Sequence, residues 1–186
     1  MTDLITRIQN FSGTVTFESL HDFVKSVDLD ADTYSPHIRE PEIDGDYGRN
    51  ILTEEPFECV LIHWPSGIES GIHLHAGLFG HVLVLEGRLD DHRYEMKGGA
   101  LFEKAVTTYG VGGIMPEPDG VIHKLRNGGS EYAITVHFYY PAITSFEGMK
   151  LFNTEKGAIG TLGPVSYTHL RAHETKTRIS AGGGGG

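Results

Sequence analysis

Two histidines separated by one residue offer the clearest chemistry in the chain. His73 and His75 lie within the segment from Gly67 to Gly87, GIESGIHLHAGLFGHVLVLEG. Successive side chains of a β-strand point to opposite faces, so both imidazoles would share one face. The aromatic and β-branched residues around them favour a strand over a helix. Because no cysteine lies nearby, the pair predicts a metal site that stays open to small ligands.

Fixed spacings around these histidines resemble the two sequence motifs of the cupin superfamily. The first motif, G-x5-H-x-H-x3,4-E-x6-G, is matched at Gly67, His73, His75 and Gly87, but Gly80 stands where the motif has glutamate. The second motif, G-x5-P-x-G-x2-H-x3-N, is matched in full by Gly112, Pro118, Gly120, His123 and Asn127. The resemblance implies that His73, His75 and His123 form a three-nitrogen metal site inside a β-barrel.

The ligand set leaves several metals open. Neutral imidazoles suit iron, nickel, copper and zinc alike, so ligand type alone does not choose among them. Without the motif glutamate, we expect no fourth protein ligand and no anionic ligand oxygen. Three positions of an octahedral metal would then stay free for a substrate and a second reactant. The alternative is a barrel whose histidines are core residues and bind no metal.

Two further segments resemble the thiol dioxygenases, specifically the bacterial cysteine dioxygenases. That family combines Y-x-R-N, an H-x-H pair, a later metal histidine and an [ST]-x-H-x-Y strand. The corresponding segments here are Tyr47-Gly48-Arg49-Asn50 and Thr135-Val136-His137-Phe138-Tyr139. The resemblance continues through Leu151-Phe152-Asn153-Thr154. It implies that Fe(II), with no organic cofactor, supports the conversion of L-cysteine and O2 to cysteine sulfinate.

The same resemblance assigns roles to the remaining site residues. Arg49 would hold the substrate carboxylate by charge-assisted hydrogen bonds, and Tyr47 would add a hydroxyl near it. Tyr139 would direct its phenol to the open face of the iron. His137 would orient that phenol, with Thr135 behind it.

The chain departs from the animal members of the family at Gly80. Those enzymes carry a cysteine there, joined by a thioether to the active-site tyrosine, so we expect Tyr139 to stay unmodified. Cys59 is expected to be a small buried apolar residue. Leu74 replaces an aspartate that is common in the family. The Tyr140–Pro141 bond is expected to be cis.

The elements that must position these residues follow from the spacing of apolar residues. Residues 3–29 are expected to form helices, with Thr16 as the cap of the second one. Residues 28–46 are expected to be an acidic, solvated loop. From Tyr47 onward, short strands separated by Gly, Pro, Asn and Asp predict an antiparallel barrel or sandwich. The candidate strands are Tyr47–Leu52, Phe57–Trp64, His81–Leu85, His92–Met96, Ala100–Lys104, Gly120–Arg126 and Tyr132–Tyr140.

Together with the motifs, this pattern predicts an all-β fold of the cupin type, a double-stranded β-helix or jelly-roll barrel with short N-terminal helices. Residues 1–165 are expected to form this single domain. The segment 166–186, SYTHLRAHETKTRISAGGGGG, has no apolar periodicity and ends in glycines. We therefore expect it to be a non-native or disordered tail, and we exclude its histidines from the site.

Composition limits the partners. The net charge of −10 argues against a nucleic-acid partner. Apolar runs are no longer than a strand, which argues against a membrane span. The N-terminal segment lacks the apolar core of a secretion signal, and a single cysteine fits a reducing compartment, so we expect a cytoplasmic protein. We also expect a monomer whose partners are a small thiol and O2.

Two alternatives to cysteine oxidation remain at this stage. One is dioxygenation of another small thiol such as 3-mercaptopropionate, although relatives that prefer it tend to carry glutamine where this chain has Arg49. The other is a cupin that binds a metal or small ligand without catalysis, or an isomerase with another metal.

Overall fold

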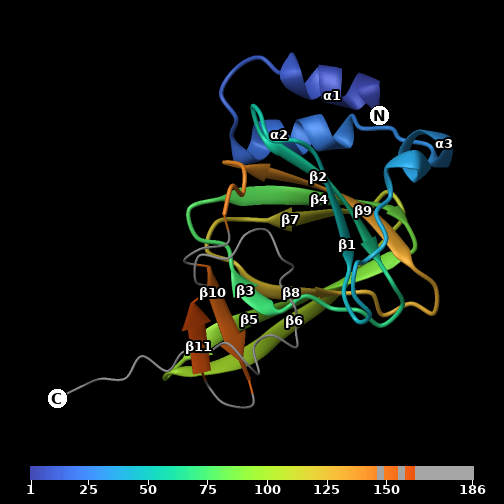
Figure 1. The fold of residues 1–186 in the computed structure, drawn as a ribbon. Coiled ribbons are helices and arrows are strands. Elements are labelled where there is room, and N and C mark those ends of the chain that lie inside the picture. The colour runs from blue at the N-terminus through green and yellow to red at the C-terminus, as the bar shows by residue number, and fades with distance from the viewer. Residues whose placement is uncertain (146–148, 155–157, 162–186) are drawn as a thin grey trace.

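The computed structural model describes residues 1–145, 149–154 and 158–161. They form two antiparallel sheets that face each other, with short helices packed over one of them (Figure 1). The predicted fold class, a β-rich cupin barrel with N-terminal helices, is confirmed. The predicted tail 166–186 lies outside the described residues, so the domain boundary at residue 165 stays a prediction.

The N-terminal segment 3–29 contains the two expected helices. The helical elements are α1 Thr2–Gln9, α2 Phe17–Lys25, the short α3 Ala31–Tyr34 and the 3-10 helix η1 Ser35–His37. The side chain of Thr16 caps α2 by accepting a hydrogen bond from the Ser19 amide at 3.1 Å, as predicted. The segment 28–46, expected to be a loop, contains α3 and η1, because Asp30 caps α3 through the Thr33 amide at 2.8 Å. Among the described residues no helix is both long and apolar enough to cross a membrane.

Sheet A contains β2 and β9, the two strands that are buried over almost their whole length. Its order is β1-β2-β9-β4-β7, with bounds β1 Gly48–Thr53, β2 Glu58–Trp64, β4 Phe79–Glu86, β7 Ile114–Glu117 and β9 Ala133–Tyr140. Sheet B has the order β11-β10-β3-β8-β5-β6, with bounds β3 Ile72–Leu74, β5 Arg88–Lys97, β6 Ala100–Gly110, β8 Ile122–Arg126, β10 Lys150–Asn153 and β11 Ala158–Thr161. All seven candidate strands are present. The sequence reading missed β7, β10 and β11, because runs of four residues are too short to show a period.

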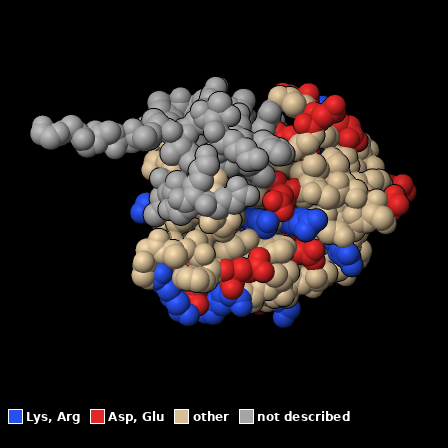
Figure 2. Space-filling model, turned by 90° about the horizontal axis from the view of Figure 1, so that it is seen from below, with Lys and Arg blue, Asp and Glu red and all other residues tan. Residues whose placement is uncertain are grey.

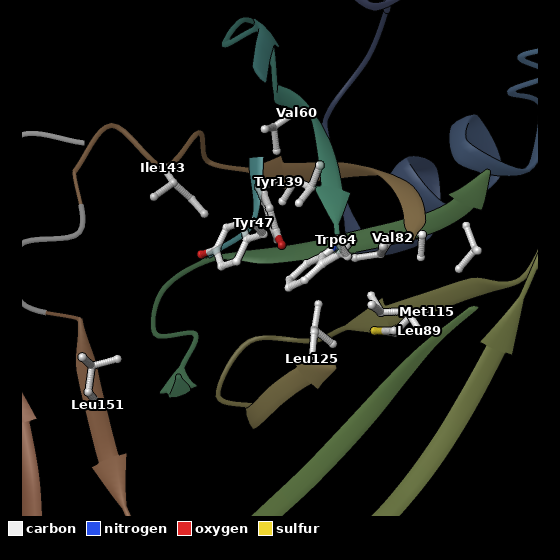
Figure 3. Close-up of a cluster of buried hydrophobic side chains, with 13 residues drawn as sticks. Tyr47, Val60, Trp64, Val82, Leu89, Met115, Leu125, Tyr139, Ile143 and Leu151 are labelled. Carbon is white, nitrogen blue, oxygen red and sulfur yellow. The ribbon is translucent and has the colours of Figure 1, made fainter. Parts of the chain in front are cut away.

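Sheet A is buried on both faces, and strand β9 contributes side chains to each face. Ile134, Val136 and Phe138 pack into an apolar cluster with residues of α1 and α2. The alternate residues point into the barrel, where Tyr139 joins a second cluster with Tyr47 and others from both sheets. In Figure 3, Tyr47, Trp64 and Tyr139 lie close together on the sheet A side, and Leu125 approaches from β8. The Tyr140–Pro141 bond that follows β9 is cis, as expected.

Candidate metal centre

The three motif histidines meet in the interior of the barrel. His73 lies on β3 and is paired directly with His123 on β8. His75 lies one residue past the end of β3, where its amide still bonds to the Val121 carbonyl at 3.1 Å. The pairing continues just far enough to keep His75 on the same face as His73. One ligand atom from each of the three imidazoles lies within 4.8 Å of the others.

Hydrogen bonds made by Nδ1 set the orientation of two of these rings. Nδ1 of His73 bonds to the Gly71 carbonyl at 2.8 Å, and Nδ1 of His123 bonds to Oδ1 of Asp91 at 3.0 Å. Each partner accepts the Nδ1 proton, so the Nε2 lone pair faces the centre of the cluster. Asp91 comes from β5 and also accepts a hydrogen bond from Nε of Arg93 at 2.7 Å. The sequence reading did not single out Asp91.

Two of the three imidazoles are held in their neutral, metal-binding form. Burial, reinforced by the neighbouring imidazoles, lowers the pKa of His73 to about 3 and the pKa of His75 well below its ordinary value. Neutral imidazole is the form that coordinates a metal ion. Nε2 of His123 is buried and has no hydrogen-bond partner among the described residues, which is costly for a polar atom. A metal ion bound by the three nitrogens fits this donor set and would satisfy that atom.

A carboxylate stands beside this cluster, although no anionic oxygen was expected here. Glu117, the last residue of β7, is fully buried. Its Oε1 lies 3.7 Å from Nε2 of His123, and its Oε2 lies 3.8 Å from Nε2 of His75. Burial raises the pKa of Glu117, against the opposing effects of His123 and the Tyr139 phenol. The sequence could have pointed to Glu117, because this residue directly precedes Pro118 of the second cupin motif.

Strand β9 carries a chain of hydrogen bonds toward the cluster. Nε1 of Trp64 donates to the Thr135 hydroxyl at 2.9 Å, and that hydroxyl is 2.8 Å from Nε2 of His137. Nδ1 of His137 is 2.8 Å from the Tyr139 hydroxyl. If Thr135 donates its single proton to His137, then His137 donates to Tyr139, and Tyr139 keeps its own proton for the site. Burial raises the pKa of Tyr139 well above its ordinary value, so the phenol is protonated.

One cavity connects most of the residues that the sequence singled out. Its lining includes Tyr47, Arg49, His73, His75, His137 and Tyr139. The cavity has about 50 Å³ of free space, room for a few waters or one small ligand. His123 and Thr135 are fully buried behind this lining.

Arg49 brings a positive charge into the cavity and is held by a carboxylate of sheet A. Its Nη2 forms an ion pair with Oε1 of Glu58, which is fully buried. The other oxygen of Glu58 accepts the Ile143 amide at 2.7 Å. Burial raises the pKa of Glu58, while Arg49 acts in the opposite direction. The ion pair therefore holds the Arg49 guanidinium at the wall of the cavity.

The position of Gly80 lies against the Tyr139 ring. A Cβ at residue 80 would come within 2.8 Å of Cε1 of Tyr139. Cys59 belongs to the apolar cluster on the helix-covered face of sheet A, whereas Tyr139 belongs to the cluster inside the barrel. Burial raises the pKa of the Cys59 thiol, so it is an unreactive, protonated group.

Comparison with known proteins places this site in a family. Residues 19–151 match the family described as cysteine dioxygenase type I. Similar solved structures include a double-stranded β-helix protein from Klebsiella pneumoniae. It has 24% identity and TM-score 0.49, and the match covers 60% of this chain and 89% of that chain. The cupin domain of Cnp3 from Schizosaccharomyces pombe has 17% identity and TM-score 0.43, over 50% of this chain and 63% of that chain. A cupin 2 barrel protein from Salinispora arenicola has 18% identity and TM-score 0.44, over 62% of this chain and 89% of that chain.

The family match covers most of the chain and includes the metal cluster and both cupin motifs. The buried histidines supply a site that can bind a metal, and the adjoining cavity can admit a small molecule. The protein therefore belongs to the cysteine dioxygenase type I family, whose members are thiol dioxygenases of the cupin fold.

Proposed function

We propose that the protein oxidises L-cysteine with O2 to cysteine sulfinic acid, using Fe(II) held by His73, His75 and His123. The observation that supports this most directly is the shared cavity. Two imidazoles of the metal cluster and the guanidinium of Arg49 line the same small cavity. A molecule with a thiol at one end and a carboxylate at the other matches both groups.

The bound metal would supply the chemistry that joins a thiolate and O2, because coordination favours deprotonation of a thiol. Arg49 would bind the substrate carboxylate and so fix the distance between that group and the thiol. Glu58 would keep the guanidinium in place through their ion pair. The buried setting strengthens these charged hydrogen bonds relative to water.

The β9 residues would orient the reacting groups. The chain from Thr135 through His137 holds the Tyr139 phenol toward the cluster, so this hydroxyl could donate to a substrate atom or to oxygen. Tyr47 would line the carboxylate end of the cavity beside Arg49. We propose that Tyr139 stays unmodified, since Gly80 supplies no thiol and Cys59 lies on the opposite face of the sheet. Intact-mass measurement after turnover should show no loss of hydrogen.

The proposal also covers the partners, the location and the oligomeric state of the protein. On the face seen in Figure 2, Lys and Arg side chains lie among Asp and Glu side chains rather than in one basic patch. We propose small-molecule partners only, without a nucleic acid or a membrane. A cytoplasmic monomer remains our expectation.

The deciding experiment loads the purified protein anaerobically with Fe(II) and then measures oxygen uptake and sulfinate for several thiols. L-Cysteine should give the highest kcat/KM, with equal amounts of oxygen consumed and sulfinate formed. The same protein loaded with Zn(II) is the matched control and should give neither. A preference for 3-mercaptopropionate by tenfold or more, about 1.4 kcal/mol, would replace cysteine as the substrate. Iron binding without sulfinate from any thiol would contradict the whole proposal.

A further inference from the structure

We propose that Glu117 is a fourth protein ligand of the metal, supplied by β7 rather than by the motif position on β4. This inference rests on the metal site of the proposed function but not on its reaction. The ligand set would then be three imidazoles and one carboxylate, with the carboxylate coming from a different strand than the cupin motif predicts.

The distances suit this assignment. The carboxylate oxygens are 3.7 Å from Nε2 of His123 and 3.8 Å from Nε2 of His75. Ligand atoms about 2.1 Å from a shared metal lie roughly 3.0–3.4 Å apart for octahedral to tetrahedral geometry. A movement of a few tenths of an ångström would therefore bring Glu117 into the coordination shell. The two imidazoles it approaches both belong to the cluster.

Burial gives a second and independent argument. Neither oxygen of Glu117 has a hydrogen-bond partner of normal geometry among the described residues, and neither does Nε2 of His123. The Tyr139 phenol lies near enough to lower the pKa of Glu117, but a neutral hydroxyl does not balance the charge of a carboxylate. An unpaired carboxylate in a protein interior is strongly destabilising, and retained buried charges are paired or bind metals. A cation between Glu117 and His123 would satisfy all of these atoms at once.

The pairing of β4 with β7 explains why the carboxylate comes from residue 117. Gly80, which stands at the motif glutamate position, is directly opposite Glu117 in the sheet register. A Cβ at residue 80 would meet the Phe138 carbonyl at 2.5 Å and Cε1 of Tyr139 at 2.8 Å. A glutamate at residue 80 would therefore require the Tyr139 ring to move. The neighbouring strand can supply a carboxylate without displacing that ring.

Glu117 does not line the cavity that would hold the substrate. The cavity is lined by His73 and His75, whereas Glu117 and His123 are fully buried and absent from its lining. A carboxylate bound there leaves the positions that face the cavity open. An octahedral metal would keep two such positions instead of the three expected from the histidines alone.

The test compares Glu117→Gln with the matched control Glu58→Gln. Glu58 is also a fully buried glutamate of sheet A, but it is paired with Arg49 and the Ile143 amide. The dissociation constant for Co(II), measured by competition with a chromophoric chelator, should rise at least tenfold in Glu117→Gln. It should change less than threefold in Glu58→Gln. Unchanged Co(II) affinity in a folded Glu117→Gln variant would overturn the assignment.

Unfolding of the metal-free variants separates a ligand from a structural residue. Glu117→Gln removes a buried carboxyl group that is costly to ionise and adds an amide that can donate to Nε2 of His123, so its melting temperature should rise. Glu58→Gln weakens the ion pair with Arg49, so its melting temperature should fall. A residue needed only for packing would lower the melting temperature without changing metal affinity, and that result would contradict the proposal.

A crystal structure of the Co(II)-loaded wild type gives a direct measurement that does not depend on any variant. An oxygen of Glu117 should lie about 2.0–2.2 Å from the metal. A distance beyond about 3 Å, with water between the carboxylate and the metal, would overturn direct ligation. None of these three readouts involves thiol oxidation. If Glu117 does not bind the metal but the iron-loaded enzyme oxidises cysteine, only this inference is wrong and the proposed function stands. If Glu117 binds the metal but the protein oxidises no thiol, the proposed function is wrong and this inference stands.

Discussion

The two faces of sheet A are both buried, but against different surroundings. On β9, Ile134, Val136 and Phe138 face α1 and α2 in an apolar cluster. The alternate residues of the same strand, including Thr135 and His137, face the barrel interior and form a chain of hydrogen bonds. Seven consecutive residues of this strand are buried, so burial alone does not distinguish the faces.

The difference lies in what each face contributes. Apolar side chains stabilise the fold by leaving water, typically about 1.5–3 kcal/mol for each large residue. Polar groups at equal depth stabilise little and become costly when a partner is missing. The helix-covered face can therefore supply the stability that allows the inner face to hold imidazoles and carboxylates. Each of the following experiments changes one face and asks whether the other responds.

The largest effect should follow removal of a metal ligand. His73→Ala, His75→Ala or His123→Ala should each lose most bound iron and all measurable turnover. Loss of a residue that hydrogen-bonds to a metal ligand already lowers metal affinity by about 10–100-fold, so loss of the ligand itself should lower it more. Elemental analysis and sulfinate assays give the measurements. Full iron occupancy in any of the three variants would contradict the assignment of that residue.

On the helix-covered face, Phe138→Ala should lower the free energy of unfolding by about 3–5 kcal/mol, because it leaves a cavity in a closely packed cluster. Metal affinity should stay near the wild-type value at temperatures where the variant is folded. The neighbouring Tyr139→Phe is the opposite-face control. It should keep iron and cost only about 1 kcal/mol of stability, but slow oxidation or uncouple oxygen use from sulfinate. Urea unfolding and oxygen-uptake assays distinguish the two, and wild-type rate and coupling in Tyr139→Phe would remove the phenol from the reaction.

In the cavity, Arg49→Ala should retain iron but lose roughly 30-fold to several thousand-fold in kcat/KM for L-cysteine. Removing one partner of a desolvated charge pair typically costs about 2–5 kcal/mol. Cysteamine, which has a thiol and an amine but no carboxylate, serves as the control substrate. It should be poor with the wild type and lose much less in the variant. Near wild-type efficiency with cysteine would show that Arg49 does not bind the carboxylate.

The smallest effect concerns pH and the helix-covered face. Burial lowers the pKa of His81, while its hydrogen bond to the Phe17 carbonyl at 3.0 Å opposes the shift. The unfolded chain binds a proton on this imidazole near pH 6.5 and the folded chain does so only at lower pH. Stability is therefore full above that pH and declines below it, by at most about 1.4 kcal/mol per pH unit.

The test of this pH effect is urea unfolding of metal-free wild type and His81→Phe at pH 7.5, 6.5 and 5.5. The variant should show a shallower decline between the two lower values, because one group that takes up a proton on unfolding is gone. Buried site histidines are the same in both proteins and contribute equally. Identical pH dependence would remove His81 as a source of the decline.

Local spacing was enough to indicate the main parts of the molecule. The H-x-H pair, the second cupin motif and the Y-x-R-N segment each depend on residues within a few positions of one another, where strand alternation is regular. The same regularity predicted the longer strands and the capped helix after Thr16. The structure then places most of the singled-out residues around one cavity, and their roles stay predictions to be measured.

Contacts between distant segments were decided only by the tertiary structure. Asp91 orients His123, and Glu58 holds Arg49, through pairs whose meeting depends on strand order and register. Glu117 reaches the cluster because β7 pairs with β4 opposite Gly80. A buried carboxylate gives no periodic signal in the sequence, since its partners come from other strands. The sequence by itself determined which imidazoles are available, whereas the packing of two sheets decided which carboxylates face them.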